Sequence, residues 1–401
     1  MSDSNKKGFA TRSIHTGEKM NQNYEPVVPD MVLTGSFIAQ HDATFSIEGQ
    51  QDSLPFFYTR WGNPTIQQLE AKLADLENAE GCVVFGSGMA AAAALFMYEL
   101  NPGDRLVMSD VCYAAVSEMA NDMIPSLNIE VERVNMTDLE QVRQALSKEA
   151  KLLYLESPNN PLMRLTDIAA VSEIARQNGT KVAIDSTFAT PVATRPLDLG
   201  ADYVIHSLTK YMNGHGDAMG GAILGGAEAI EEIRRKILIK TGGVISPFNA
   251  WMIIRGLTTL SIRMREHEHN AIEVAQMLEN HPAVKKVVYP GIPSHPQYEL
   301  AKRQMDNFSG MLTFQVEDGR KAARLFSEQL ELAKYAVSLG HHHTLVYYMP
   351  TDEMLTTTFR LTPEQEQSYR DYAGEGVFRL SVGLENAADI CNDLKNVLDQ
   401  L

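Results

Sequence analysis

Apolar residues recur along most of the chain with two spacings, which predict strands alternating with helices. Between residues 63 and 207, short apolar runs are separated by segments whose apolar positions recur every three to four residues. The runs that we expect to form strands are CVVF, DRLVMS, VERVN, KLLYLES, KVAIDS and DYVIHS. This alternation is typical of an α/β domain with a mostly parallel sheet.

The helical segments carry signals of their own. The segment NPTIQQLEAKLADLENAEG has a proline in its first turn and an apolar face formed by Ile66, Leu69, Leu73 and Leu76. The longest apolar stretch, residues 89–100, is too short to span a bilayer and contains a glutamate. We therefore expect it to form a buried helix.

Changes in pattern near residues 62 and 255 divide the chain into three parts. Residues 1–62 lack sustained periodicity and contain three prolines, so we expect an extended arm that contacts a neighbouring subunit. Residues 63–255 hold the alternating strands and helices. Residues 256–401 begin with a long helical stretch followed by strand-like runs such as MLTFQVED and AKYAVSLG, which predicts a smaller α+β domain.

The composition narrows the possible partners and compartments. The net charge is −16, which argues against a nucleic-acid binder or a protein of anionic membrane surfaces. Cys82, Cys112 and Cys391 show no paired spacing, as expected in a reducing compartment. The first residues lack the apolar core of a secretory signal. We therefore expect a cytoplasmic protein with no nucleic-acid or membrane partner.

A lysine and an aspartate that follow two predicted strands point to a specific cofactor. Lys210 lies in SLTKYMNGHGD, between hydroxyl residues and a glycine-rich turn, and Asp185 ends the run KVAID, 25 residues upstream. Sites in open sheets lie at the carboxyl ends of the strands, so the two side chains can converge. Pyridoxal 5′-phosphate (PLP) requires this pair, because a lysine forms its Schiff base and a carboxylate keeps its ring nitrogen protonated.

A phosphate site is predicted close to this pair. The turn GSGM follows the run CVVF, so that Gly88 and Met89 begin a helix whose N-terminus favours an anion. Ser207 and Thr209, which precede Lys210 in the same motif, can add hydroxyl donors to the same phosphate. A tight strand-to-helix turn without a ligand is the alternative interpretation of GSGM.

Four further side chains have two interpretations each. Tyr113 suits stacking on a pyridine ring with acid–base work, or a half-buried core position. Arg379, in the apolar run FRLSVGLE, needs an anion, which is either a substrate α-carboxylate or an internal acid. Tyr58 and Arg60 lie at the end of the arm, where they either clamp a phosphate, including one in a second subunit, or anchor the arm.

The histidines are not expected to bind a metal. His341, His342 and His343 are consecutive, and three consecutive side chains cannot easily share one ion. His267 and His269 lie two residues apart on a predicted helix, on different faces, and are expected to be solvated. No metal site is predicted.

The chain contains the motifs ESPNNP, DSTFATP, HSLTKYMNGHGD, RGLTTLSIRM, YPGIPSHP and RLSVGLE in this order. From about Thr11 to the C-terminus it resembles the Cys/Met-metabolism family of fold-type I PLP-dependent enzymes. The family includes cystathionine γ-synthase, cystathionine lyases, methionine γ-lyase and the O-acylhomoserine sulfhydrylases. The resemblance implies a fold-type I transferase with a seven-stranded sheet, and a homotetramer that is a dimer of dimers with shared active sites.

The resemblance also implies a role for each candidate. Lys210 resembles the Schiff-base lysine that carries protons between substrate carbons, and Tyr113 resembles the ring-stacking tyrosine that protonates the leaving group. Asp185 resembles the partner of the ring nitrogen, and Asn160 the contact of the cofactor's phenolic oxygen. The implied phosphate cradle comprises Gly88, Met89, Ser207 and Thr209, joined from the neighbouring subunit by Tyr58 and Arg60. The implied clamp of the substrate α-carboxylate comprises Ser338 and Arg379.

The implied reaction is γ-elimination from a γ-substituted L-amino acid of the homoserine or homocysteine type. γ-Replacement, as in an O-acylhomoserine sulfhydrylase or a cystathionine γ-synthase, and elimination by a cystathionine β-lyase are the alternatives. The chain departs from the family at Ala115, where methionine γ-lyases typically carry a cysteine. It also departs at His343, roughly where an acidic residue is usual, and at Met349, where a histidine is usual.

These departures suggest an altered leaving group, including an O-linked one such as the hydroxyguanidine of canavanine. The three consecutive histidines, with Tyr347 and Tyr348, are expected to line the distal substrate pocket. The alternative is that the histidines cap a solvent-exposed loop.

Overall fold

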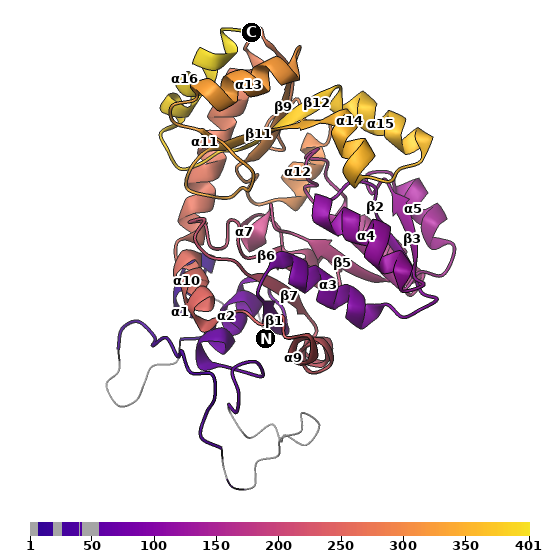
Figure 1. Cartoon of the computed structure of the whole chain (residues 1–401), viewed down its shortest axis with the longest axis vertical. Helices are drawn as coiled ribbons and strands as arrows, with labels where there is room; N and C mark the ends of the chain where they lie inside the picture. The colour runs from indigo at the N-terminus through magenta and orange to yellow at the C-terminus, as the bar shows by residue number, and fades with distance from the viewer. Residues whose placement is uncertain (1–6, 19–25, 40, 42–55) are drawn as a thin grey trace.

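The structure, a computed structural model, describes residues 7–18, 26–39, 41 and 56–401. A seven-stranded sheet with the order β1-β7-β6-β5-β4-β2-β3 lies in its lower half (Figure 1). The strands are β1 (Gly81–Phe85), β2 (Arg105–Ser109), β3 (Glu130–Val134), β4 (Leu152–Glu156), β5 (Lys181–Asp185), β6 (Tyr203–Ser207) and β7 (Gly221–Gly225). Only β7 runs against the others, so the predicted α/β fold with a mostly parallel sheet is confirmed.

Six of these strands match predicted runs, whereas β7 was missed. Its sequence GAILG is short and bounded by glycines, so it carries little local β signal. The glycine at its start is required by packing, because a Cβ on Gly221 would lie 2.1 Å from the backbone oxygen of Ser87. Strand β7 therefore brings the end of β1 close to the end of β6.

Helices cover both faces of this sheet. They are α2 (Pro64–Leu76), α3 (Gly88–Glu99), α4 (Ala114–Ser126), α5 (Leu139–Leu146), α6 (Ile168–Gln177), α7 (Thr190–Ala193), η3 (Pro196–Leu199), α8 (Ala227–Ile233), η4 (Arg234–Leu238), α9 (Ile239–Thr241) and α10 (Pro247–Leu257). The predicted apolar face of α2 is buried, and the apolar stretch 89–100 lies mostly in the buried helix α3, as expected. Alternate residues of β1 face opposite ways, with Val84 packed in one core cluster and Val83 in another.

A second sheet, with the order β10-β11-β12-β9-β8, lies in the upper half of Figure 1. Its strands are β8 (Val284–Val288), β9 (Met311–Val316), β10 (Lys334–Tyr335), β11 (Leu345–Pro350) and β12 (Gly376–Ser381). The helices around it are α11 (Leu260–Glu279), α12 (Tyr298–Gln304), α13 (Gly319–Gln329), α14 (Thr351–Glu353), η5 (Met354–Thr358), α15 (Pro363–Ala373) and α16 (Ala387–Leu398). The strand expected in AKYAVSLG is only two residues long, and its remainder leaves the sheet. Strand β11 was not anticipated. The two sheets fall within the ranges 63–255 and 256–401, whose boundaries stay predictions.

The arm is described only in part, since residues 1–6, 19–25, 40 and 42–55 of the predicted arm 1–62 lie outside the described residues. Helix α1 (Phe9–His15) packs against α2. The buried Lys72 ammonium donates to the carbonyl oxygens of Ser13 (2.8 Å) and Ile14 (2.6 Å). These bonds anchor α1 on helix α2 of the same chain.

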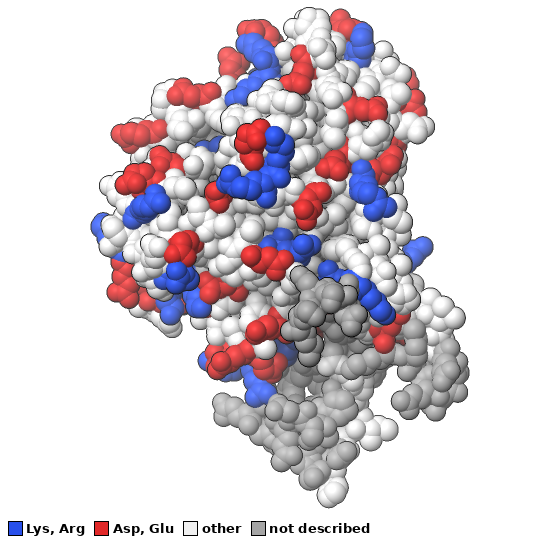
Figure 2. Space-filling model, turned by 180° about the vertical axis from the view of Figure 1, so that it is seen from behind, with Lys and Arg blue, Asp and Glu red and all other residues white. Residues whose placement is uncertain are grey.

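The surface drawn in Figure 2 carries basic and acidic side chains interspersed with one another. Mixed charge of this kind creates no extended positive field over that face. Within the described ranges, no helix is both long and apolar enough to cross a bilayer.

Candidate active site

Four predicted site residues follow four adjacent strands of the seven-stranded sheet. Tyr113 follows β2, Asn160 follows β4, Asp185 ends β5 and Lys210 follows β6. These strands are parallel, so their carboxyl ends lie along one edge. The structure thus places at one edge the residues that the sequence assigned to one site.

Asp185 is a buried carboxylate that forms no ion pair with any described residue. It accepts hydrogen bonds from the Thr187 amide (3.0 Å) and from the Tyr154 hydroxyl (3.4 Å). Burial raises the pKa of Asp185, and the bonds from Thr187 oppose that rise. A buried carboxylate is costly to ionise without a cation, and a protonated pyridine nitrogen supplies one.

Lys210 is also without a carboxylate partner among the described residues. Its Nζ donates to Ser338 Oγ at 2.9 Å. Burial, and to a lesser extent the positive charge of Arg379, lowers the pKa of Lys210 to about 8. A substantial fraction of its amine is therefore neutral near physiological pH, as a nucleophile or a base requires.

The beginning of helix α3 lies against the end of strand β6. A Cβ on Gly88 would lie 2.9 Å from Ser207 Cβ and 3.0 Å from its Oγ, so only a glycine permits this approach. Met89 follows in the first helical turn, where amide groups lack intrahelical partners. The Thr209 hydroxyl contacts the backbone of Gly220 on the adjacent turn (3.2 Å to its nitrogen). Backbone amides and hydroxyls thus gather in the manner that a phosphate needs.

The residues present fit PLP. Three features lie along the same sheet edge. They are a buried carboxylate without a salt bridge, a lysine of lowered pKa, and a helix N-terminus that begins at a glycine. PLP needs a partner for its ring nitrogen, an amine for its carbonyl carbon and donors for its phosphate. Asp185, Lys210 and the turn at Gly88 would supply these in order.

Arg379 joins the second, five-stranded sheet to this edge of the first. It is buried on β12, and its Nη1 donates to Asn160 Oδ1 (3.0 Å) while its Nη2 donates to the Ser338 carbonyl oxygen (3.2 Å). Among the described residues it forms no salt bridge, but the buried Glu156 carboxylate interacts with it through its charge, so the interpretation as the partner of an internal acid stays open beside that of a substrate α-carboxylate. Burial lowers the pKa of Arg379, and the negative charge of Glu156 opposes that shift.

Tyr113 stands at the start of α4 with 42% of its surface exposed, so it is not a core tyrosine. Its backbone amide donates to the Glu156 carboxylate at 2.8 Å. Glu156 was missed by the sequence reasoning, although it ends β4 opposite Asp185 in register. An acid that ends an otherwise apolar strand was the available signal. Burial, with the nearby charge of Asp185, raises the pKa of Glu156.

The segment after β10 carries Ser338 to the site. Ser338 has φ of +85°, and Gly340 follows with φ of +69°. The Gly340 amide donates to Ser381 Oγ at 2.9 Å, and a Cβ on Gly340 would lie 2.6 Å from the backbone nitrogen of Tyr211. The segment therefore rests closely on the turn that contains Lys210.

Two expectations about the histidines and tyrosines are corrected. His267 is fully buried rather than solvated, because its face of α11 lies against the end of β12, where Nδ1 is 2.7 Å from the Val382 carbonyl oxygen. His269 is exposed, as expected, and lies 3.2 Å from the carboxylate of Glu273. Tyr348 does not line the site, because alternation along β11 turns it into the C-terminal core against Phe378.

Tyr58 and Arg60 contact residues of their own chain. Arg60 Nη1 donates to the Ile239 carbonyl oxygen (2.5 Å), and its guanidinium lies 5.4 Å from the Tyr58 ring centroid. Neither side chain contacts the phosphate cradle through any hydrogen bond found among the described residues. Their role in a second subunit stays a prediction.

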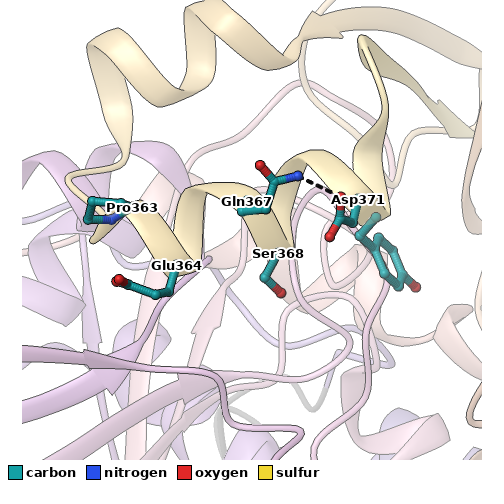
Figure 3. A pocket seen from close by; sticks show the side chains of 6 residues that line it. Pro363, Glu364, Gln367, Ser368 and Asp371 are labelled. Carbon is teal, nitrogen blue, oxygen red and sulfur yellow. Dashed lines mark hydrogen bonds between the residues drawn. The ribbon is translucent and has the colours of Figure 1, made fainter.

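A depression of about 740 Å³ lies along α15 (Figure 3). It is lined by Pro363, Glu364, Gln367, Ser368, Asp371 and Tyr372. Gln367 donates to Asp371 at 2.8 Å, so the polar groups there partly satisfy one another. No predicted site residue lines this depression.

The family model described as Cys/Met metabolism PLP-dependent enzyme matches residues 10–399 of the chain. The chain belongs to this family. It therefore uses PLP, and the predicted cofactor and enzyme class are confirmed.

Relatives of this Cys/Met-metabolism enzyme are similar over its whole length. An L-methionine γ-lyase of Treponema denticola is 41% identical over 99% of this chain and 98% of its own. A canavanine γ-lyase of Pseudomonas canavaninivorans is 36% identical over 98% and 96%. A solved structure of cystathionine γ-synthase from Xanthomonas oryzae pv. oryzae is 34% identical, has a TM-score of 0.88, and matches over 98% of each chain. The similarity to relatives named as γ-lyases confirms the predicted γ-elimination.

Proposed function

We propose that this enzyme is a γ-lyase for L-amino acids of the homoserine type whose γ substituent is polar and O-linked, as in canavanine. The observation that carries the proposal is the linkage of Lys210, Ser338, Arg379 and Asn160 by hydrogen bonds between the two domains. This linkage puts a base of lowered pKa beside a buried arginine that forms no salt bridge with any described carboxylate. An amino acid needs both groups, one for its Cα proton and one for its carboxylate.

Each residue has a task in this proposal. The Arg379 guanidinium and Ser338 hold the substrate α-carboxylate by charge-assisted hydrogen bonds. Lys210 removes the Cα proton and then a Cβ proton, while Tyr113 gives a proton to the departing heteroatom at Cγ. PLP, when bound, supplies the electron sink that makes the Cα proton removable. Glu156 fixes the backbone of Tyr113 through its 2.8 Å contact.

The choice of leaving group rests on the segment that follows Ser338. His343 stands roughly where an acidic residue is expected in relatives, and Ala115 replaces the expected cysteine on the first turn of α4. Imidazoles offer hydrogen bonds to a polar leaving group, which a methylthio group does not require. This supports an O-linked substituent over methanethiol as the departing group.

We further propose a homotetramer in the cytoplasm. Its support is the exposed position of Tyr58, together with the acidic charge and the unpaired cysteines. Two inactive variants, Arg60→Ala and Lys210→Ala, are expected to regain activity when subunits are exchanged, because one mixed site then has both residues intact. Absence of complementation would argue that Arg60 acts within its own chain.

A product screen tests the reaction. The purified enzyme is incubated with canavanine, methionine, cystathionine, homocysteine, O-acetylhomoserine and O-succinylhomoserine, and products are identified by mass spectrometry. Homoserine or 2-oxobutyrate formed fastest from canavanine is expected. If methanethiol is released from methionine faster than any other product forms, the assigned leaving group is wrong, but the enzyme is still a γ-lyase.

A γ-replacement synthase is the second candidate, because the fold matches a solved cystathionine γ-synthase over 98% of each chain. Both reactions share the deprotonation steps at Lys210. Adding a thiol to the same screen separates them. Turnover that requires the thiol and gives a new thioether would show that the enzyme is a synthase rather than a lyase. Pyruvate as the product would instead indicate a β-lyase.

A further inference from the structure

A buried arginine of helix α11 lies against the turn that carries Lys210. Arg263 Nη1 donates to the Tyr211 carbonyl oxygen at 2.7 Å, and its Nη2 donates to the Met212 carbonyl oxygen at 3.4 Å. Tyr211 and Met212 directly follow Lys210 in the chain. The guanidinium therefore bonds the backbone of the lysine's own turn.

The same guanidinium also bonds the junction between α10 and α11. Its Nη2 donates to the Gly256 carbonyl oxygen at 2.7 Å, and its Nε donates to Thr259 Oγ1 at 3.1 Å. Gly256 lies in the last turn of α10, and Thr259 immediately precedes α11. Arg263 therefore joins the turn after β6 to the segment through which the chain passes from α10 to α11.

Glycines permit this close fit. A Cβ on Gly214 would overlap the Arg263 guanidinium, and a Cβ on Gly256 would overlap the Asn213 carbonyl group. Gly214 also closes the turn, because its amide donates to the Lys210 carbonyl oxygen at 2.8 Å. The lysine turn and the arginine are thus packed without space for either to shift.

Arg263 carries its charge without an acid. It is 6% exposed, and within the described part of the chain its hydrogen bonds all go to carbonyl or hydroxyl oxygens. Burial lowers the pKa of Arg263 to about 10. A buried charge without an ionic partner is costly, and an apolar side chain would fill the same space at lower cost. Stability of the fold alone therefore does not account for this arginine.

A guanidinium is suited to hold several backbone groups at fixed positions. It is planar and presents its donors in a rigid fork, whereas an ammonium group is a point charge on a flexible stem. One rigid group that bonds the carbonyl groups after Lys210 and the junction of two helices keeps their separation constant. Catalytic side chains need support of this kind, because their positions must be held within about 0.5 Å.

We propose that Arg263 is a positioning residue, which fixes the turn of Lys210 so that the lysine amine is placed for the carbonyl carbon of PLP. It acts through the backbone, and no bond to Arg263 forms or breaks in the reaction. The inference rests on the role of Lys210 in the proposed function. It does not depend on the leaving group, so a different substrate would leave it unchanged.

Binding of two cofactor forms to the cofactor-free protein tests where the lysine is placed. PLP has an aldehyde that the lysine can bond, whereas pyridoxine 5′-phosphate has an alcohol there and binds without that bond. Arg263→Lys should weaken PLP binding about 10-fold to 100-fold and leave the binding of pyridoxine 5′-phosphate unchanged. The control, Arg265→Lys, replaces an exposed arginine of the same helix and should change neither dissociation constant.

A role in folding alone gives a different result. Equal losses for the two ligands in Arg263→Lys, or no loss for either, would overturn the positioning role. Lys210→Ala calibrates the measurement, because it should abolish the preference for PLP. If Lys210→Ala keeps the wild-type preference, the assignment of Lys210 in the proposed function is wrong, and the role of Arg263 fails with it.

Hydrogen exchange reports on the turn without any ligand. In Arg263→Lys the Gly214 amide should exchange about 10-fold faster, because the turn that it closes has lost hydrogen bonds to the guanidinium. Unchanged exchange would contradict the positioning role. If Arg263→Lys does not fold, Thr259→Val takes its place, since it removes one acceptor of the guanidinium and keeps the charge. A selective loss in PLP binding of about 3-fold would then support the role, and unchanged binding would overturn it.

Discussion

The two regions that meet at the site are built in different ways. Asp185, Ser207 and Lys210 stand at or just after the ends of paired strands, where register along the sheet determines their separation. Ser338 and His341 lie on an irregular segment that follows the two-residue strand β10. Hydrogen bonds between paired strands fix the first region. The second region has no such pairing, and its backbone follows the left-handed conformation of Ser338 and Gly340 and a few side-chain contacts.

In the proposed function, the first region holds the cofactor and the second region selects the substrate. Changes at a strand end alter the register or the burial of a whole sheet, so they disturb the fold together with the cofactor. Changes at positions 341 to 343 affect a segment whose backbone is fixed by Ser338 and Gly340. The histidine run of the second region therefore interrupts no strand pairing.

The largest expected effect is at the strand-end region. Lys210→Ala should reduce kcat by about 10⁴-fold, since general acid–base groups of this kind contribute up to that factor. The fold should persist, because Lys210 forms no ion pair within the described part of the chain and its burial is unfavourable for the charged form. Turnover and the thermal unfolding midpoint are the measurements.

Lys151→Ala is the matched control, because this lysine is exposed just before β4. It should leave both quantities unchanged. Turnover retained in Lys210→Ala would remove Lys210 from the proposed mechanism.

A buried histidine close to both regions, His267, should make the stability of the folded protein depend on pH. Burial lowers the pKa of His267 to about 4, whereas the unfolded chain should have a value near 6.5. The unfolded state therefore binds more protons between these values, so the free energy of unfolding falls as the pH falls through this window. From pH 7 to pH 5 this group should cost about 2 kcal/mol.

His267→Gln can keep a donor for the Val382 carbonyl oxygen and should remove this part of the acid sensitivity. Denaturant unfolding at both pH values measures the change. The exposed His269→Gln variant should retain the wild-type difference. An unaltered difference in His267→Gln would show that its imidazole already carries a proton in the folded protein.

Arg379 tests the proposed contribution of the second sheet to substrate binding. Arg379→Lys keeps a positive charge but loses the fork that reaches both Asn160 and Ser338. A loss of about 2 kcal/mol, or roughly 30-fold in kcat/KM, is expected for charge-assisted hydrogen bonds. Steady-state kinetics measure it, with the exposed Arg143→Lys as the control. A loss in kcat alone, with KM unchanged, would argue against a carboxylate clamp.

The sequence was most informative where function and local pattern coincide. Asp185 and Lys210 follow strands that apolar runs reveal, so their meeting at one sheet edge could be predicted. Strand β7 could not, because its glycines are required by the close approach of Ser87, which is a contact between distant segments. The burial of His267 was likewise hidden, since it depends on how β12 meets α11.

The histidine run shows the same limit inside the site. Sequence reasoning treated His341, His342 and His343 as a group, but the positive φ of Ser338 and Gly340 turns only His341 toward Ser338 Oγ. His343 is exposed to solvent, and the imidazole of His342 lies 4.2 Å from that of His343. Adjacent residues on an irregular segment follow no period, so their directions depend on the tertiary structure.

The smallest expected effect tests whether the strand-end region tolerates a single methyl group. Gly88→Ala places a Cβ 2.9 Å from Ser207 Cβ, so the start of α3 and the end of β6 must separate slightly. Overpacking of this kind costs about 1–3 kcal/mol, and we expect cofactor affinity to fall about 10-fold. Gly243→Ala is the control, because its nearest neighbour would be Phe85 Cδ1 at an ordinary 3.6 Å. Titration of cofactor-free protein with PLP, followed by absorbance, gives both dissociation constants. Equal PLP affinity in the two variants would argue that the phosphate does not bind at Gly88. Cofactor binding at the strand ends would then be no more sensitive to an added methyl group than it is at Gly243.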